Sequence, residues 1–406
     1  MKTPGVFLFL GSLLISALML PGKPLTVDSR TNLETTRALA HGKLSVPRSL
    51  VTRAGHGGNH YSLYGPLLPV VALPGFLAAG IFEEMSQPGD EDCRLGDCLA
   101  LATNTWLSAL LIWLLFRIGV MASIPAWESA LLAGVCGLST LIFPYSRDFF
   151  NQPLTAVCLL AAFYFLILQK NRQADSAGVE RNNLQFIWAS FAMGASILSR
   201  MDMMVLVPGF LLSASVLAWR TNPRGGIDFW KSIAAVVIPI SFCAGSLLLF
   251  DWFRWGGLLA TPYARLSFRT PWIDTLPRFF FSPDLSVLLY NPLLLVSWGT
   301  IFLTWRTCRW LYSGVLVLSI TYLILISSYV DYHGGICPGP RYLMVLVPLH
   351  LLPLFLGWKY LQRKWMAFAA ISLVALPGLL MNGYSAWVDY TKMPTAWDFW
   401  SSLLSG

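Results

Sequence analysis

Charged residues are scarce in this sequence. Aspartate, glutamate, lysine and arginine make up 12% of its 406 residues, whereas hydrophobic residues make up 56%. A soluble globular protein carries about 25% charged residues, so the composition excludes an ordinary soluble domain. Apolar runs long enough to cross ~30 Å of hydrocarbon recur along most of the chain. The sequence therefore predicts an integral membrane protein.

The sequence also lacks several motifs that mark common enzymes. It contains neither GxxxxGKS/T nor a GxGxxG that follows a strand, and neither HExxH nor GxSxG occurs. No basic cluster interleaves with aromatic residues, so the formal charge of +8 does not indicate a nucleic-acid partner. Any activated substrate is therefore expected to arrive through the lipid rather than as a nucleotide.

Cysteine is uncommon and gives little guidance. Of the seven cysteines, Cys93 and Cys98 fall together in an acidic loop. Either a disulfide in an oxidising compartment or two free thiols fits this placement. No second ligand pair follows them, so this spacing does not indicate a zinc site.

The apolar runs predict an all-α polytopic membrane protein with about 11 transmembrane helices. No run alternates like a barrel strand, so each crossing is expected to be a helix. A twelfth run, Leu67–Phe82, is interrupted by two prolines and two glycines, and we expect a re-entrant or interfacial segment there. The predicted spans are Gly5–Leu20, Leu99–Leu115, Trp127–Phe143, Leu154–Leu168, Phe186–Leu198, Met203–Ala218, Ile233–Phe250, Leu285–Thr304, Leu311–Tyr329, Tyr342–Trp358 and Met366–Met381.

Lysine and arginine predict the orientation, because cytoplasmic loops carry an excess of them. With eleven spans and the N-terminus inside, the inner connections hold many basic residues and only four acidic ones. If Leu67–Phe82 spanned, every later loop would invert. The predicted location is the cytoplasmic, inner membrane, with the polar candidates on the periplasmic face. The basic residues are Lys2, Arg117, Lys170, Arg172, Arg181, Arg220, Arg224, Lys231, Arg306, Arg309, Lys359, Arg363 and Lys364.

The domain organisation follows from this topology. Residues 1–385 are expected to form a single transmembrane domain, in which residues 22–98 are a long first outer loop with juxtamembrane helices. Residues 386–406 are expected to be a short interfacial tail. Gly5–Leu20 could be the apolar part of a signal peptide, but no small-x-small cleavage site follows it, which favours a retained anchor.

Asp28 and Asp148 are the first candidates for chemistry. Asp28 either caps an amphipathic helix over residues 29–41 or acts as a catalytic acid or base. Arg147 and Asp148 either pair in an outer turn or present a second carboxylate that faces Asp28. Two such carboxylates could hold a divalent cation, or one could deprotonate a hydroxyl.

Two further segments place arginine at a membrane edge. Arg200 needs a partner at that depth: either Asp202 or Asp148 forms a structural bridge with it, or it binds an anion such as phosphate. Residues 332–342 contain three glycines, and His333 and Arg341 lie near their two ends. Glycine N–H groups beside Arg341 suit a phosphate, whereas the alternative is a rigid turn with a snorkelling arginine.

The order of these motifs resembles the GT-C superfamily of glycosyltransferases that use polyprenyl-phosphate sugars, in the bacterial branch of protein mannosyltransferases and aminoarabinose transferases. Asp28 and Asp148 fall where the first-loop and second-loop acids of that family fall. Residues 61–69 look like its Tyr/Pro-rich segment, and residues 333–342 are similar to its Gly-Gly and Gly-Pro-Arg-Tyr signature. Asp148 departs from the family pattern because bulky residues follow it. No large soluble C-terminal domain is present, which favours transfer of a single sugar.

The resemblance implies an inverting membrane glycosyltransferase that moves a sugar from a polyprenyl-phosphate donor to a lipid, glycan or protein acceptor. Asp28 would be the general base, and Asp148 would assist it or bind a divalent metal with it; no other cofactor is implied. A transporter or flippase of a lipid-linked saccharide is the alternative, which expects ionisable groups near the midplane. The expected substrate-binding residues are Tyr61, Tyr64, Arg147, Arg200, Asp202, Tyr263, His333, Arg341 and Tyr342.

Overall fold

The structure is a computed structural model of the 406-residue chain. It describes residues 3–83, 95–175, 183–222, 225–258, 260, 268, 270–389 and 391. Of the residues named in the sequence analysis, several lie outside the described residues: Lys2, Cys93, Arg181, Arg224, Tyr263 and most of the segment 386–406. Cys98 is disulfide-bonded.

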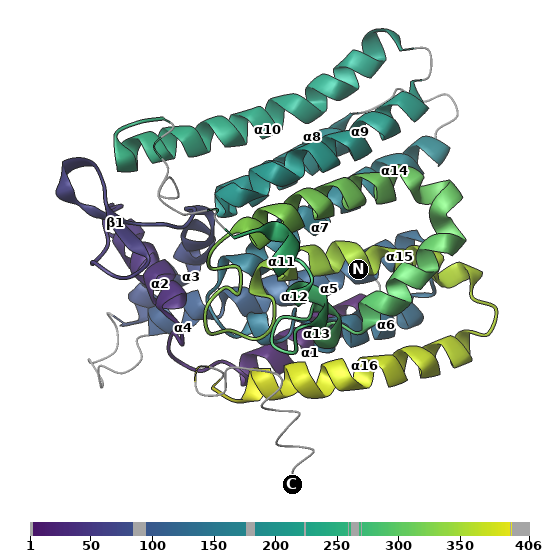
Figure 1. The fold of residues 1–406 in the computed structure, drawn as a ribbon, viewed down its shortest axis with the longest axis horizontal. Coiled ribbons are helices and arrows are strands. Elements are labelled where there is room, and N and C mark those ends of the chain that lie inside the picture. The colour runs from purple at the N-terminus through teal and green to yellow at the C-terminus, as the bar shows by residue number, and fades with distance from the viewer. Residues whose placement is uncertain are drawn as a thin grey trace.

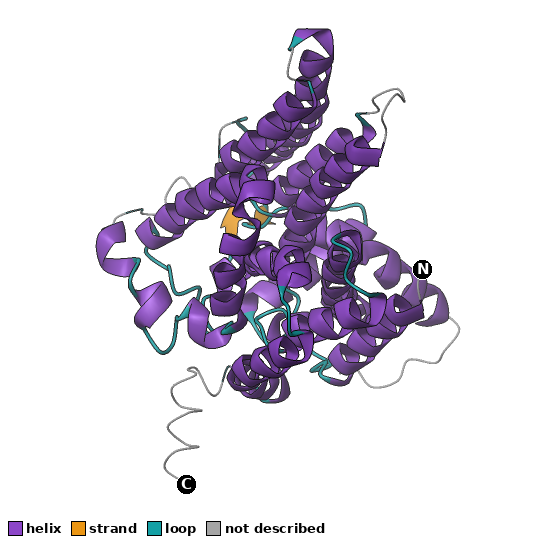
Figure 2. Cartoon of the chain, turned by 90° about the vertical axis from the view of Figure 1, so that its right-hand side faces the viewer, coloured by secondary structure: helices purple, strands orange, loops and turns teal. Residues whose placement is uncertain are grey.

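The described chain is built from helices, with one small hairpin (Figures 1 and 2). Strands β1 (Thr52–Ala54) and β2 (His60–Ser62) pair antiparallel with Arg53 opposite Tyr61. The helices are α1 (Thr3–Leu18), α2 (Val27–Ala40), α3 (Leu67–Glu83), α4 (Leu95–Leu101), α5 (Thr103–Met121), α6 (Ala126–Leu138), α7 (Asn151–Asp175), α8 (Leu184–Ser199), α9 (Val207–Thr221), α10 (Gly226–Trp255), α11 (Trp272–Thr275), α12 (Arg278–Phe281), α13 (Val287–Tyr290), α14 (Leu293–Ser328), α15 (Val347–Gly357) and α16 (Lys364–Trp387), with 3-10 turns η2 (Pro144–Ser146), η3 (Met201–Leu206) and η5 (Arg341–Leu346).

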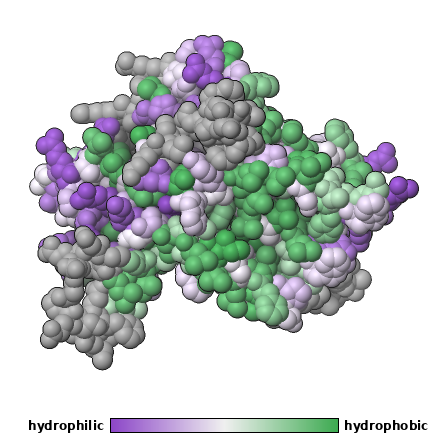
Figure 3. Space-filling view, turned by 90° about the horizontal axis from the view of Figure 1, so that it is seen from below, coloured by the Kyte–Doolittle hydropathy of each residue, from purple (hydrophilic) through white to green (hydrophobic). Residues whose placement is uncertain are grey.

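The long helices have the length and apolar surface of membrane spans. Seven helical segments of the described chain are long and apolar enough to cross a membrane, and four shorter apolar helices accompany them. Large apolar side chains on the outermost helices point outward, as at Phe242 (67% exposed), Phe302 (86%) and Leu373 (72%). Figure 3 shows apolar residues covering the middle of one face while hydrophilic residues gather toward its ends. The expected all-α polytopic membrane fold is confirmed.

Helix α14 covers two of the predicted spans. It is bent at Cys308, whose backbone leaves the helical region (φ −113°, ψ 16°). Beyond the bend the chain turns back, and Figure 1 shows the two halves running in different directions. The hydroxyls of Thr304 and Tyr312 lie 2.5 Å apart across this bend. The predicted turn between Leu285–Thr304 and Leu311–Tyr329 is therefore present, but as a bend within one helix.

Two of the differences between the predicted spans and the observed helices have a physical cause that the structure shows. The run Leu67–Phe82 forms the continuous helix α3 through Pro74, because a helix in an apolar setting can lose one backbone hydrogen bond while neighbours satisfy the rest. Helix α6 ends at Leu138, five residues before the predicted end of its span. Just beyond this end, the backbone N–H of Leu141 donates to the side-chain oxygen of Asn291 at 2.9 Å and not to a helical carbonyl, so the helical hydrogen-bonding pattern stops.

Helix α2, the hairpin and α3 cover one end of the bundle. The connection between α9 and α10, the bend of α14 and the connection between α15 and α16 lie at the opposite end (Figure 1). Arg254 at the end of α10 ties the hairpin to the bundle, since it donates to Ser62 O at 2.7 Å and pairs with Asp251. Arg37 of α2 pairs with Glu34 and with Asp97 of α4. The pair between Arg37 and Asp97 joins α2 to α4 and so to the bundle.

Candidate active site

Asp28 lies in the first turn of α2, but it does not cap this helix. The cap is Thr26, whose side-chain oxygen accepts a hydrogen bond from Ser29 N at 3.2 Å. The Asp28 carboxylate instead pairs with the guanidinium of Arg341, and these side chains are 13% and 10% exposed. The capping interpretation of Asp28 is therefore wrong. The fold brings together two residues that the sequence marked in segments far apart.

Arg341 belongs to a group of polar side chains that we call the arginine cluster: Asp28, Gln152, Arg200, Asp202 and Arg341. Gln152 is buried near the start of α7. With its amide oxygen toward the two arginines, it accepts from Arg341 Nε at 3.0 Å and from Arg200 Nη1 at 2.8 Å. Arg200 in turn donates to both carboxylate oxygens of Asp202, at 3.0 and 2.6 Å. One neutral amide thus holds two guanidinium groups, each of which also faces a carboxylate.

Aromatic rings fix the planes of the two guanidinium groups. Arg200 lies 5.2 Å from the ring centroid of Tyr342, and Arg341 lies 5.5 Å from the same ring and 4.8 Å from that of Phe150. Such cation–π contacts add stabilisation where the cation is partly desolvated. Tyr342, expected as a substrate-binding residue, therefore positions both arginines.

Asp202 is the main partner of the Arg200 guanidinium. Burial lowers the pKa of this guanidinium, but Asp202, Tyr322 and Tyr342 together raise it by more than burial lowers it. The Tyr322 hydroxyl also donates to Asp202, at 3.1 Å. The arginine cluster therefore carries two positive and two negative charges at a partly exposed position. A guanidinium fork of this kind suits a phosphate or a carboxylate.

Arg147 and Asp148 point to different parts of the fold. Arg147 donates to the backbone oxygens of Ala386 and Val388, at 2.5 and 2.7 Å, and so satisfies carbonyls at the C-terminal end of α16. Asp148 is buried and accepts a hydrogen bond from the hydroxyl of Ser29 in α2. The two residues do not form an exposed pair. Asp148 holds the start of the helix that carries Asp28.

The described residues contain no group of three His, Cys, Asp or Glu side chains arranged to hold a metal ion. The Asp148 carboxylate accepts from the hydroxyls of Ser29 and Thr26, the latter at 3.3 Å. The Asp28 carboxylate faces a cation already. A metal held by Asp28 and Asp148 remains a prediction.

The glycine-rich segment folds as a turn in which two glycine N–H groups are already bonded. Gly334 N donates to Asp331 O at 2.9 Å, and Gly335 N donates to His333 Nδ1 at 3.1 Å. Gly339 has φ 58°, and a Cβ there would lie 2.7 Å from the Tyr290 ring, so glycine is required. His333 is exposed. The glycines shape the turn that delivers Arg341 to the arginine cluster.

The expected tyrosines take different positions. Tyr61 is buried in β2 and packs edge-on against Trp255, with ring centroids 5.8 Å apart. The Tyr64 backbone oxygen accepts from Arg254 at 3.1 Å. Tyr61 therefore anchors the hairpin rather than lining the arginine cluster.

Sequence reasoning missed Gln152 and Tyr322. Gln152 stands at the start of an apolar run, directly after Asn151, and a polar side chain at a membrane edge is a functional candidate by default. That signal was present in the sequence. Tyr322 lies among apolar residues of α14 and carries no comparable local signal.

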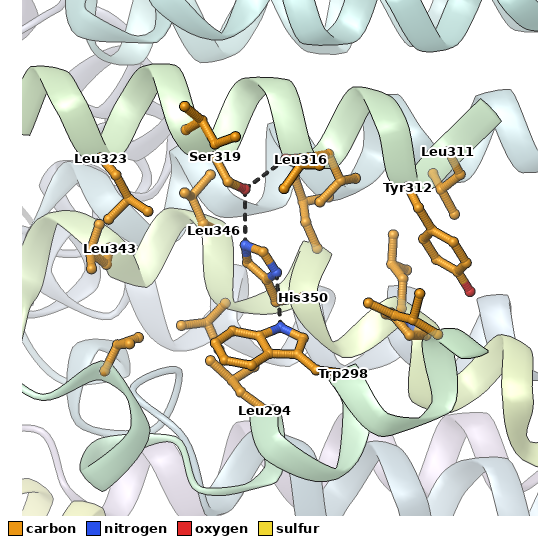
Figure 4. A pocket seen from close by; sticks show the side chains of 18 of the residues that line it. Leu294, Trp298, Leu311, Tyr312, Leu316, Ser319, Leu323, Leu343, Leu346 and His350 are labelled. Atoms are coloured by element: carbon orange, nitrogen blue, oxygen red, sulfur yellow. Dashed lines mark hydrogen bonds between the residues drawn. The ribbon is translucent and has the colours of Figure 1, made fainter. Parts of the chain in front are cut away.

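An apolar cavity of about 300 Å³ lies between α14 and α15 and is also lined by Leu343 and Leu346 of η5 (Figure 4). Three of its lining residues form a hydrogen-bonded chain. Trp298 Nε1 donates to His350 Nδ1 at 3.2 Å, so the ring proton is on Nε2, which lies 2.9 Å from Ser319 Oγ. Ser319 donates to Val315 O at 2.7 Å. The surrounding lining is mostly apolar, with leucine as its commonest residue, as at Leu343.

Comparisons of the whole fold place these features among membrane proteins of known structure. ArnT from Cupriavidus metallidurans bound to undecaprenyl phosphate matches with a TM-score of 0.56 at 15% identity, over 94% of this chain and 65% of that one. The archaeal oligosaccharyltransferase AglB from Archaeoglobus fulgidus, in complex with an inhibitory peptide and a dolichol-phosphate, matches with a TM-score of 0.53 at 11% identity.

The chain has a GT-C-like fold. The resemblance drawn from the sequence is thus confirmed at the level of the fold. The match to AglB covers 97% of this chain and 56% of that one, so this GT-C-like chain spans about two thirds or less of these structures' length. No protein-family model and no curated protein sequence matches it.

Proposed function

We propose that this GT-C-like protein is a membrane glycosyltransferase that takes a sugar from a polyprenyl-phosphate donor. The observation that supports this function best is the arginine cluster. Two guanidinium groups share the neutral Gln152 and lie beside the carboxylate of Asp28. An anion-binding pair next to a base is what transfer from a phosphate leaving group requires. A protein of similar fold was solved with undecaprenyl phosphate bound.

In the proposed reaction Asp28 accepts the proton of the acceptor hydroxyl. The acceptor oxygen forms a bond to the anomeric carbon while the bond between that carbon and the phosphate oxygen breaks, which inverts the anomeric centre. The electron pair stays on the phosphate, which gains one negative charge. Arg341 and Arg200 stabilise that charge as it develops.

Asp148 acts indirectly in this proposal. Its hydrogen bond with Ser29 holds the first turn of α2, which carries Asp28. The acceptor in this proposal is a lipid, a glycan or a protein, and it binds on the periplasmic face of the inner membrane. Five described residues of the expected substrate site lie outside the arginine cluster, and the proposal gives them no part in binding the donor phosphate: Tyr61, Tyr64, Arg147, His333 and Tyr342.

Sugar transfer in liposomes tests the function. Purified protein would receive a panel of radiolabelled polyprenyl-phosphate sugars with lipid and peptide acceptor extracts. Asp28→Asn keeps the shape of the side chain, and we expect it to lower the turnover by about 10²–10⁴-fold, the usual contribution of a general base. A variant that transfers sugar at the wild-type rate would rule out Asp28 as the base.

The same liposomes test the alternative. A flippase would move label between leaflets without transferring sugar, in the wild type and in Asp28→Asn alike. The charged residues of the arginine cluster gather at one end of the bundle rather than along a path between both faces, which favours the enzyme.

A further inference from the structure

Asp28 and a donor phosphate need the same partner. The contact that the described part of the structure gives the Asp28 carboxylate is the ion pair with Arg341. While this pair is closed, the Oδ2 atom of Asp28 faces a guanidinium and not an acceptor hydroxyl. In the pairing seen here Asp28 is therefore not placed to act as the base. The geometry suggests what releases it.

We propose that the phosphate of the donor displaces Asp28 from Arg341, so that the base becomes free only when a donor is bound. This inference rests on the proposed function, because it takes a polyprenyl phosphate as the ligand of Arg341. The donor phosphate replaces the Asp28 carboxylate as the partner of Arg341 Nη2. Because the same step frees Asp28, the base becomes active when the donor binds.

Arg341 is built to exchange partners without moving. Its Nε is held by Gln152 at 3.0 Å, and its plane is set by the rings of Phe150 and Tyr342. The nitrogen that faces Asp28 is Nη2, which shares one edge of the guanidinium with Nε, as the two bonds from Arg200 to Asp202 show. A phosphate oxygen can replace the carboxylate at Nη2 while Nε–H still donates to Gln152. An arginine has separate N–H donors for two partners in one plane, whereas a lysine ammonium is a single point charge.

Asp28 is also the more easily released of the two carboxylates. Asp202 accepts two hydrogen bonds from Arg200 and a third from Tyr322. Asp28 lies at the start of α2, whose backbone is fixed by Thr26 and Ser29 through Asp148. A change of its side-chain rotamer is enough to leave Arg341, and no backbone shift is required. The exchange is therefore expected at Arg341 and not at Arg200.

Gln152 can hold both arginines without competing for their charge, because its amide is neutral. A carboxylate at the same place would hold both guanidinium groups but would also cancel a positive charge that the phosphate needs. After transfer, the phosphate leaves, Asp28 gives its proton to water and pairs with Arg341 again. The cycle then returns to the structure described here.

Binding of undecaprenyl phosphate to the full chain in lipid nanodiscs tests the exchange. We expect Asp28→Asn to tighten binding about tenfold, the factor that applies if the ion pair is closed in about 90% of free molecules. Arg341→Gln should weaken binding, and adding Asp28→Asn to Arg341→Gln should then change nothing. Glu34→Gln is the matched control, since Glu34 lies on the same helix but pairs with Arg37, and its affinity should equal that of the wild type.

Whether Asp28→Asn tightens or weakens the binding of undecaprenyl phosphate decides whether the exchange takes place. Unchanged or weaker binding would overturn the exchange, and weaker binding would mean that Asp28 itself holds the ligand, directly or through a metal. Binding of undecaprenol, which lacks the phosphate, is measured beside that of undecaprenyl phosphate. This measurement separates the exchange from the proposed glycosyltransferase function, and a variant that still binds undecaprenol is folded. If the wild type binds undecaprenyl phosphate no better than undecaprenol, the phosphate-donor function fails, and the exchange fails with it.

Discussion

The arginine cluster and the cavity around His350 both include residues of η5, Arg341 in the cluster and Leu343 and Leu346 in the cavity, yet their polar groups are paired in different ways. In the cluster, charges are paired with partners that an anion could replace, and the side chains keep partial exposure. In the cavity, Trp298, His350 and Ser319 satisfy one another, so an apolar surface remains. The first arrangement is ready to exchange a ligand, and the second is closed to one that needs hydrogen bonds.

Gln152→Glu is the variant of the arginine cluster from which we expect the largest effect on donor binding. The new carboxylate can still accept hydrogen bonds from both arginines, but it adds a negative charge to a cluster whose two positive and two negative charges otherwise balance, and this charge repels a phosphate. We expect the affinity for undecaprenyl phosphate to fall by about 10–100-fold, the range that corresponds to ~1.5–3 kcal/mol for a hydrogen bond to a charged group. Binding measured in nanodiscs checks this result. Gln152→Glu that binds as tightly as the wild type would show that the cluster is structural.

Arg341→Lys sharpens the same comparison with a smaller change. Lysine keeps the positive charge but cannot bond Gln152 and a second partner through a planar fork. We expect the apparent KM for the donor to rise by about tenfold, about 1.4 kcal/mol, with a smaller change in kcat. Steady-state transfer at varied donor concentration measures both constants. An unchanged KM would argue against Arg341 as the phosphate ligand.

His350→Leu tests the cavity side. The variant leaves the indole N–H of Trp298 without its acceptor, and an unsatisfied buried donor costs ~1–3 kcal/mol. We expect a lower thermal midpoint in detergent, while transfer by the folded protein stays as in the wild type. Adding Trp298→Phe should restore part of the stability, because both partners are then apolar. A large loss of donor affinity in His350→Leu would break the distinction between the two regions.

Tyr322→Phe should have the smallest effect. It removes one of three hydrogen bonds to Asp202, and a typical bond of this kind contributes ~0.5–1.5 kcal/mol. Arg200 keeps its two bonds with Asp202, so we expect the affinity for undecaprenyl phosphate to change less than about threefold. The nanodisc assay again provides the measurement. A change as large as that of Gln152→Glu would make Tyr322 part of the phosphate site.

The sequence by itself determined the class of the protein. Hydrophobic length and the scarcity of charge predict membrane helices because each helix satisfies its own backbone hydrogen bonds, a local property. The same local reasoning marked Asp28, Arg200 and Arg341 as polar groups at a membrane edge, and the resemblance of short motifs led to the fold that comparison with solved structures confirms.

Only the tertiary structure decided which of these groups meet. Local sequence could not show that Arg147 donates hydrogen bonds to the end of α16 or that Asp148 accepts one from Ser29 in α2. It also could not show that α3 continues through Pro74. It equally gave no way to join Asp28 to Arg341 through a bundle that also positions Gln152. An ion pair depends on distance in space, and distances between remote segments are set by how helices pack rather than by the residues beside each charge.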